Sequence, residues 1–246
     1  MASKTYSYLA DVYNDMMRFI DYRTWAKYII VLSRLTGNKN KSALEIAGGS
    51  GTLAKLLYNR FSFYVLSDLS SEMLANSSPV VKNKISCSFY NLPFKKKFNF
   101  VFSTFDSVNY ILTKKNFVLM LEEVANILED DGVFTFDVSL ERNSLKHLKN
   151  LNRQGEVNGI KYFQKSIYNP KTRIHTNRFD IILADGEKVQ EIHKQRVYHF
   201  KDYFQMIDKS DFYVYGCYKT FSFDDADESA ERAQFILKKR KPNAHI

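Results

Sequence analysis

Residues 44 to 51 form an apolar run that leads into a glycine-rich turn, Leu44-Glu45-Ile46-Ala47-Gly48-Gly49-Ser50-Gly51. Helical spacing begins directly after it, at Thr52. Glycines at a strand-to-helix turn let the backbone approach a ligand closely. An acidic residue, Asp68, ends the next apolar run. It follows the turn at about the 20-residue distance at which an acid meets ribose hydroxyls in nucleotide-binding βαβ units. The turn and the acid together predict a site for an adenosine-containing ligand.

Segments with strand and helix character alternate from residue 42 onward. Strand patterns lie at 42–47, 62–68, 84–89, 99–104 and 133–139, and helical patterns at 51–60, 71–77 and 115–129. Such alternation predicts a parallel sheet with helices on both faces, in which ligands collect beyond the carboxyl ends of the strands. The glycine turn, Asp68 and Phe105–Asp106 all follow strand ends, so we expect them to meet at one site.

Different patterns flank this alternating region. Helical spacing at 5–19 and 22–36 predicts a helical preface over residues 1–40. Residues 156–168, 172–184 and 187–200 read as long strands, and Asp185-Gly186 is a strong hairpin signal. A short helix at 200–209 and strands at 212–221 and 231–239 follow. We therefore expect one α/β domain formed by 41–150 and 201–246, with an antiparallel insertion at 151–200.

These motifs stand in the order found in class I S-adenosylmethionine (SAM) dependent methyltransferases, which the chain resembles over nearly its whole length. Glu45–Gly51 resembles the first motif, with Ala47 in place of its first glycine. Asp68–Leu74 resembles the second motif, Phe102–Tyr110 the fourth, and Leu128–Val138 the helix, turn and fifth strand. The resemblance implies a Rossmann-like α/β fold with a mostly parallel seven-stranded sheet, a helical preface and an antiparallel β insertion after the fifth strand.

The same resemblance implies SAM as cofactor and S-adenosylhomocysteine as product. The residues it implies for the cofactor lie in the preface, around the glycine turn and after the second, third and fourth strands. They are Tyr13, Tyr22, Trp25, Glu45, Ala47, Gly48, Gly49, Gly51, Asp68, Leu69, Met73, Asn91, Leu92, Thr104, Phe105 and Ser107.

Several of these positions have a second interpretation. Asp68 suits ribose hydroxyls, but an aspartate before Ser70–Leu74 is also a common helix N-cap. Glu45 either meets the cofactor or braces the glycine turn through backbone N–H groups. The family often has an acid after the third strand for the adenine amino group, and residues 88–93 contain none. Asn91 or a backbone carbonyl would then take that role.

Methyl transfer leaves few marks in a sequence, because it needs a positioned nucleophile and, for an amine, a nearby base. We expect catalytic roles for Tyr13, Asp106 and His193. Tyr13-Asn14 resembles the family's Tyr-Asp pair, and Asp106 follows the fourth strand. Each also has a structural interpretation: a core stripe for Tyr13 with Tyr22 and Trp25, a turn for Asp106, and a hydrogen-bonded strand position for His193.

Residues 191–200 resemble the Glu-x-His-x-x-Arg-x-Tyr strand of small-molecule methyltransferases, including amino-sugar N-methyltransferases, whose antiparallel sheet covers the active site. Strand alternation puts Glu191 and His193 on one face. The resemblance implies that Arg196 contacts an anion. Substrate-binding candidates are Arg196 and Tyr198 here, and Asn109 and Tyr110 after the fourth strand.

Composition narrows the class of protein. The 246 residues are 45% hydrophobic, and no run reaches the ~20 residues of a membrane span. Residues 1–7 lack an apolar signal core, so we expect a cytoplasmic protein with no membrane partner. Cys87 and Cys217 have no metal-ligand spacing, so we expect two reduced thiols and no metal.

The net charge of +9 attracts anions and is compatible with a phosphorylated acceptor such as a nucleotide-linked amino sugar. A small-molecule acceptor is the leading interpretation, and a homodimer is compatible with it. An RNA or protein methyltransferase is the alternative. No RNA-binding module is visible, and residues 106–109 differ from the Asn/Asp-Pro-Pro-Tyr/Phe motif of base-amino methylation, so nucleic acid is disfavoured. A non-catalytic SAM-binding module is a third interpretation, favoured by Ala47 and opposed by Asp68 and Gly49.

Overall fold

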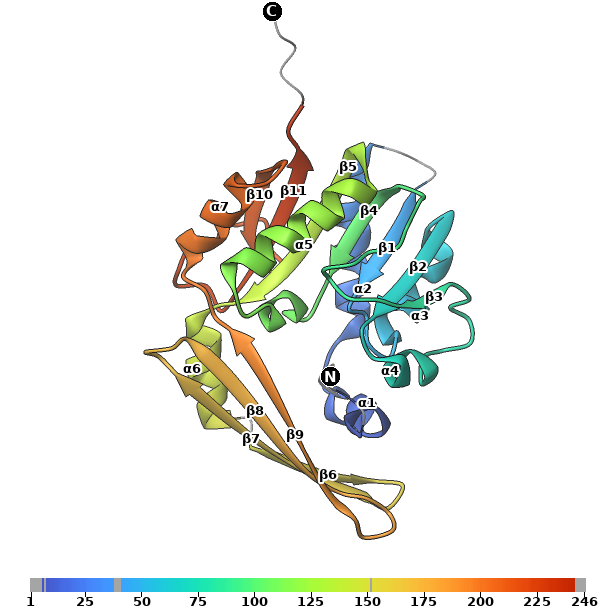
Figure 1. The fold of residues 1–246 in the computed structure, drawn as a ribbon, viewed down its shortest axis with the longest axis vertical. Helices are drawn as coiled ribbons and strands as arrows, with labels where there is room; N and C mark the ends of the chain where they lie inside the picture. Colours follow the sequence, from blue (N-terminus) through green and yellow to red (C-terminus); the bar gives the residue numbers. More distant parts are fainter. Residues whose placement is uncertain (1–5, 7, 38–40, 151, 242–246) are drawn as a thin grey trace, which may run out of the picture.

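The computed structural model describes residues 6, 8–37, 41–150 and 152–241. Figure 1 shows a large twisted sheet flanked by helices, with a smaller sheet below it. The strand order of the large sheet is β10-β11-β5-β4-β1-β2-β3. Its strands are β1 Ser42–Ile46, β2 Phe63–Asp68, β3 Lys84–Ser86, β4 Phe98–Ser103, β5 Leu128–Ser139, β10 Phe212–Lys219 and β11 Arg232–Lys239. Because β11 runs antiparallel to both β5 and β10 while β1–β5 run parallel, the predicted mostly parallel seven-stranded fold is confirmed.

Helices cover both faces of this sheet, and each packs a stripe of apolar side chains against it. On one face, α2 (Tyr22–Ser33) and α3 (Thr52–Leu57) pack around Leu32 and Phe102. On the other, α5 (Lys114–Ile127) and α7 (Phe200–Asp208) pack around Phe117 and Phe235. The remaining short elements are η1 Leu9–Asp11, α1 Tyr13–Met16, η2 Arg34–Thr36, η3 Tyr58–Arg60, α4 Ser71–Ala75 and η4 Ser107–Tyr110. No helix in the described ranges is long and apolar enough to cross a membrane.

The second sheet is antiparallel and four-stranded, and we call it the roof sheet. Its strands, in spatial order, are β6 Arg153–Val157, β7 Ile160–Asn169, β8 Ile174–Ile182 and β9 Lys188–Arg196. The prediction of one strand over 156–168 was wrong, because Asn158 and Gly159 both take left-handed φ values, 50° and 79°, and form a hairpin turn. The strand expected over 187–200 ends at Arg196, and the chain enters α7 at Phe200.

One helix was not expected, and one expected helix is mostly missing. The helix α6 (Glu141–Asn150) leads from β5 into the roof sheet. The helix expected over 5–19 is reduced to η1 and α1, which lie between the two sheets (Figure 1). Side chains of the turn after β1 and of β7 hold α1 there: the Ser50 hydroxyl donates to Asn14, and the Tyr162 hydroxyl donates to Asp15, each over 2.7 Å.

The side chain of Asn109 joins η4 to both sheets. Its amide nitrogen donates to the carbonyl oxygens of Ser139 (3.1 Å) and Arg196 (2.8 Å), and its amide oxygen accepts from the Ser139 N–H (3.0 Å). The residue is fully buried. The expectation that Asn109 binds substrate is therefore not supported, because all of these contacts are internal.

We predict that Asn109→Ala lowers the free energy of unfolding by about 2–4 kcal/mol, since three hydrogen bonds are lost and buried backbone groups are left unpaired. Urea unfolding measures this change. Asn59→Ala, at an exposed position, is the matched control and should alter stability by less than about 0.5 kcal/mol. Equal effects of the two substitutions would show that Asn109 does not join the sheets.

Candidate active site

The glycine turn forms the floor of the site between β1 and α3. Gly49 has a φ of 59°, and a Cβ there would lie 3.0 Å from the Met73 Cε and 4.0 Å from a ring carbon of Tyr13. Glycine therefore keeps the space above the turn open. Ala47, which departs from the family motif, takes a φ of 56°, a left-handed conformation that costs about 1–2 kcal/mol for a residue with a Cβ.

Asp68 holds this turn to the end of β2. One carboxylate oxygen accepts from the Gly49 N–H over 2.7 Å, and the other accepts from the Ser70 N–H over 2.8 Å. Burial raises the pKa of Asp68, against these backbone hydrogen bonds, which lower it. The N-cap of α4 is Ser70, whose hydroxyl accepts from the Met73 N–H, so capping of that helix does not account for Asp68.

Glu45 lies behind the turn. Its carboxylate is buried, accepts from the Tyr64 hydroxyl, and sits under Gly48, where a Cβ would come 2.7 Å from the Glu45 Cδ. Burial raises the pKa of Glu45 to about 8; the Tyr64 hydrogen bond opposes the shift, and the nearby Asp68 charge adds to it. Of the two roles considered for Glu45, the structure favours bracing, through Tyr64 and packing rather than through backbone N–H groups.

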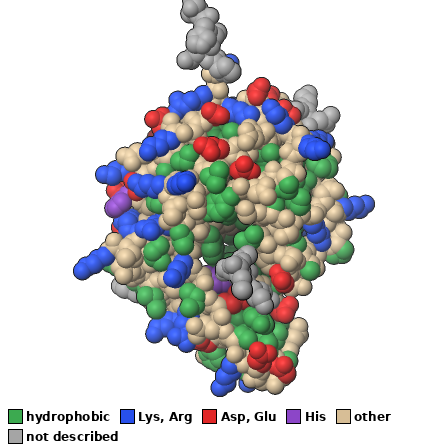
Figure 2. Space-filling model, viewed as in Figure 1, with side chains coloured by type: hydrophobic (Ala, Val, Ile, Leu, Met, Phe, Trp, Pro, Cys, Tyr) green, Lys and Arg blue, Asp and Glu red, His purple; other side chains and the backbone are tan. Residues whose placement is uncertain are grey.

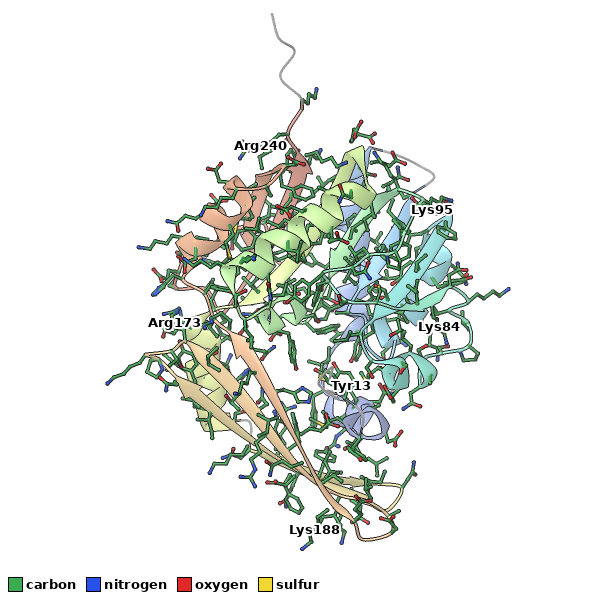
Figure 3. The ribbon with its side chains drawn as sticks, in the orientation of Figure 1. Tyr13, Lys84, Lys95, Arg173, Lys188 and Arg240 are labelled. Carbon is green, nitrogen blue, oxygen red and sulfur yellow. The ribbon has the colours of Figure 1, made fainter. Side chains whose placement is uncertain are left out.

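A cavity of about 420 Å³ opens between the glycine turn and the roof sheet, within the size range of small-ligand sites. Figure 2 shows a hollow between the upper and lower parts of this face. Nine predicted site residues line the cavity: Tyr13, Ala47, Gly49, Asp68, Leu69, Met73, Ser107, Tyr110 and His193. A small recess beside it adds Tyr22, Gly48 and Phe105. In Figure 3, Tyr13 lies between the two sheets.

Five other residues predicted for the cofactor do not line these spaces. Trp25 packs against Phe105 and Phe221, each with ring centroids 4.7 Å away, and so supports the recess from behind. Leu92 and Thr104 are buried in the interior, Asn91 is exposed, and Gly51 is the N-cap of α3. After the third strand, where the family often has an acid for the adenine amino group, residues 87–90 line the cavity and Asn91 does not. The expected role of Asn91 in adenine binding is therefore not supported.

Arg196 and Tyr198 do not reach the cavity either. The Arg196 guanidinium donates to the carbonyl oxygens of Leu112 and Thr172, and the Tyr198 hydroxyl donates to that of Ile111. Both residues line a separate depression at the end of the roof sheet. Their expected substrate-binding roles are not supported, because their polar groups bind backbone.

Asp106 is engaged in an internal ion pair. Its carboxylate binds Arg232 over 2.7 Å and accepts from the Gln195 amide over 2.8 Å. Its own N–H donates to Asp137, which also pairs with Arg232. Asp106 does not line the cavity, so its expected catalytic role is not supported. The network instead fixes the turn after β4, where Asp106 takes a φ of 50°.

One wall of the cavity is built from aromatic side chains of η4, of β9 and of Tyr6, which precedes η1. The Tyr110 hydroxyl of η4 lies 3.0 Å from the His193 Nδ1 and 2.7 Å from the Tyr6 hydroxyl. The His193 Nε2 lies 3.0 Å from the Glu191 carboxylate. Burial raises the pKa of both tyrosines, so their hydroxyls stay protonated at neutral pH.

Tyr6 and Glu191 were not among the predicted site residues. For Glu191 a signal existed, because strand alternation already put it on the same face as His193. Tyr6 had no signal, since its position depends on how the N-terminal segment crosses the cavity. Segment 87–90 likewise reaches the cavity through the path of the loop after β3.

The residues around the cavity fit SAM. Each Asp68 oxygen accepts one N–H and keeps a lone pair for a ribose hydroxyl. Leu69, Met73 and the ring of Phe89 provide apolar surface for a base, and Ser107 and Tyr22 provide hydroxyls near the glycine turn for a methionine end.

Residues 43–132 match the family described as "Methyltransferase domain". The chain is 23% identical over 245 residues to "Putative methyltransferase YqeM" of Bacillus subtilis (strain 168), covering 96% of this chain and 97% of that protein. A SAM-dependent methyltransferase from Clostridium acetobutylicum ATCC 824 has the same fold, with a TM-score of 0.78, 22% identity, and coverage of 95% and 98%.

The sugar N-methyltransferase KedS8 from Streptoalloteichus sp ATCC 53650 also shares the fold, with a TM-score of 0.75, 15% identity, and coverage of 94% of this chain and 92% of that one. The chain therefore contains a methyltransferase domain and has the fold of SAM-dependent methyltransferases, which indicates a SAM-dependent methyltransferase.

The raised pKa of Glu45 predicts a pH dependence of stability. Folded Glu45 keeps its proton up to about pH 8, whereas the unfolded side chain loses it near the usual glutamate pKa of 4.5. Stability should therefore fall as the pH rises from about 5 to 8. We predict that Glu45→Gln, which keeps an oxygen for Tyr64, makes the free energy of unfolding less dependent on pH in this range. Identical slopes for both proteins in denaturant titrations would contradict the assignment.

Proposed function

We propose that the enzyme methylates a nitrogen or oxygen atom of a small polar metabolite, and that a nucleotide-linked amino sugar is a substrate of this type. The observation that carries the proposal is a buried histidine at the cavity wall, joined to Tyr110 on one side and to Glu191 on the other. When bound, SAM supplies a methyl group on a sulfonium that a nucleophile displaces in line. The side chains on this wall receive the proton that the nucleophile gives up.

The cavity also supports a compact acceptor. Its volume of about 420 Å³ must hold both the cofactor and the acceptor, and the roof sheet and α1 enclose it from below. The rings of Tyr6, Tyr13 and Tyr110 suit an amine, because aromatic faces stabilise a nearby positive charge by about 0.5–2 kcal/mol. The fold shared with KedS8, named as a sugar N-methyltransferase, points to the same acceptor class.

We predict that Asp68→Ala weakens SAM binding at least tenfold, about 1.4 kcal/mol, because the ribose loses its acceptor and the turn its anchor. Isothermal titration calorimetry measures the affinity. Asp130→Ala, whose native side chain is 94% exposed, is the control and should leave the affinity unchanged. Unchanged affinity of a folded Asp68→Ala protein would contradict the ribose assignment.

Methyl-labelled SAM, mixed with the protein and a cell extract that is then separated by size, tests the acceptor class. We predict label in the small-molecule fraction. His193→Ala should reduce labelling by about 10²-fold or more while SAM affinity changes little. Label on RNA or protein would overturn the proposed acceptor class, and equal losses of labelling and affinity would assign His193 a structural role.

A further inference from the structure

The carboxylate of Glu191 is surrounded by hydrogen-bond donors from two parts of the chain. One oxygen accepts from the backbone N–H groups of Tyr8 (2.7 Å) and Leu9 (3.0 Å). The other accepts from the Tyr6 N–H (2.7 Å) and faces the His193 Nε2 (3.0 Å). The residue is buried, so no water competes for these positions.

The ionisation of Glu191 fixes the tautomer of His193. Burial raises the pKa of Glu191, but the hydrogen bonds from His193, Tyr8, Leu9 and Tyr6 outweigh it and leave the pKa below the usual value. The side chain is therefore a carboxylate at neutral pH and can only accept hydrogen bonds. The His193 Nε2 must then carry the proton, and in the neutral imidazole the Nδ1 is an acceptor.

The tautomer in turn sets the direction of the next hydrogen bonds. The Tyr110 hydroxyl lies 3.0 Å from Nδ1 and must donate to it. Its oxygen then accepts from the Tyr6 hydroxyl, 2.7 Å away. Tyr6 lines the cavity, and its oxygen keeps a lone pair free to accept a proton from a bound molecule.

We infer that Glu191 is a positioning residue that directs a proton relay through Tyr6, Tyr110 and His193 and also docks the N-terminal segment that supplies Tyr6. As the acceptor loses its proton to Tyr6, the Tyr6 proton passes to Tyr110 and the Tyr110 proton passes to the His193 Nδ1. Three protons each cross one hydrogen bond, so that the acceptor loses one proton, His193 gains one, and the resulting imidazolium lies beside the Glu191 carboxylate. The relay is complete only when Tyr6, Tyr8 and Leu9 are docked, because the same carboxylate accepts their N–H groups. The transfer of the acceptor proton rests on the proposed function, whereas the tautomer and the docking do not.

Glu191→Gln tests the positioning role directly. An amide offers one accepting oxygen and one donating nitrogen, so it cannot satisfy the donors on both sides. Either Tyr8 and Leu9 lose their acceptor, or His193 turns to the Nδ1–H tautomer. Glu187→Gln, in the exposed turn before β9, is the matched control.

Two measurements that need no acceptor report these outcomes. Nitrogen-15 NMR of labelled histidines at pH 8, with His193 identified by its absence in His193→Gln, should show the Nε2–H tautomer in the native protein. In Glu191→Gln we expect either the opposite tautomer or amide hydrogen exchange at Tyr8 and Leu9 at least ~10-fold faster, with neither change in Glu187→Gln. An Nδ1–H tautomer in the native protein, or no change in Glu191→Gln, would overturn the inference.

Tyr6→Phe tests the relay without disturbing the docking, because the Tyr6 N–H remains. It should reduce transfer of label from methyl-labelled SAM to the small-molecule fraction at least ~10-fold, while hydrogen exchange at Tyr8 and SAM affinity stay unchanged. Undiminished transfer by Tyr6→Phe would exclude Tyr6 from the relay. A native protein that labels no small molecule would refute the proposed function and leave the tautomer and docking results standing.

Discussion

The two hydrogen bonds that Asp68 accepts fix the geometry on which the rest of the site depends. The strands β1 and β2 are parallel neighbours, so the glycine turn and Asp68 emerge side by side. Asp68 accepts from the Gly49 N–H in the turn after β1 and from the Ser70 N–H just after β2. The Gly48 N–H also donates to the Ser67 carbonyl of β2. These hydrogen bonds hold the glycine turn, in which Gly49 has a left-handed φ, at a fixed position relative to the Asp68 carboxylate.

A second carboxylate, that of Glu191, plays the corresponding role at the roof sheet. Glu191 connects the roof sheet to the N-terminal segment, just as Asp68 connects β2 to the glycine turn. Burying a carboxylate is costly unless donors surround it, and backbone N–H groups supply most of those donors at both positions. The helix α1 links the glycine turn to the roof sheet, because Asn14 accepts from Ser50 and Asp15 accepts from Tyr162.

The fold could be predicted from the sequence because its signals are local. Each buried strand has its own apolar run, and the glycine turn and Asp68 follow strand ends in the expected order. The same local signals located Gly49, Asp68, Met73 and Ser107 at the cavity. The Asn158-Gly159 dipeptide is itself a local turn signal. The hairpin was nevertheless missed, because one continuous strand was predicted over residues 156–168.

The wall formed by Tyr6, Tyr110 and His193 could be predicted only in part. Tyr110 and His193 were expected at the site, but the contacts that complete this wall join distant segments. Asp106 and Arg196 look like site residues by type and position, yet Arg232 engages the first and backbone carbonyls the second. Tyr6 is held in the site by residues far along the chain, Glu191, which lies 185 positions away, and Tyr110. Side-chain chemistry alone does not show which polar groups are already satisfied inside the fold.

A crystal structure of the enzyme with S-adenosylhomocysteine tests most directly whether Asp68 and the glycine turn hold the cofactor in this cavity. We expect the ribose hydroxyls to lie within hydrogen-bond distance of Asp68 and the base to lie beside Met73 and Phe89. The sulfur should face Tyr6 and Tyr110. A nucleoside bound outside the cavity, or bound in the reverse direction with its sulfur at residues 87–90, would contradict the placement of the cofactor and acceptor in one shared cavity.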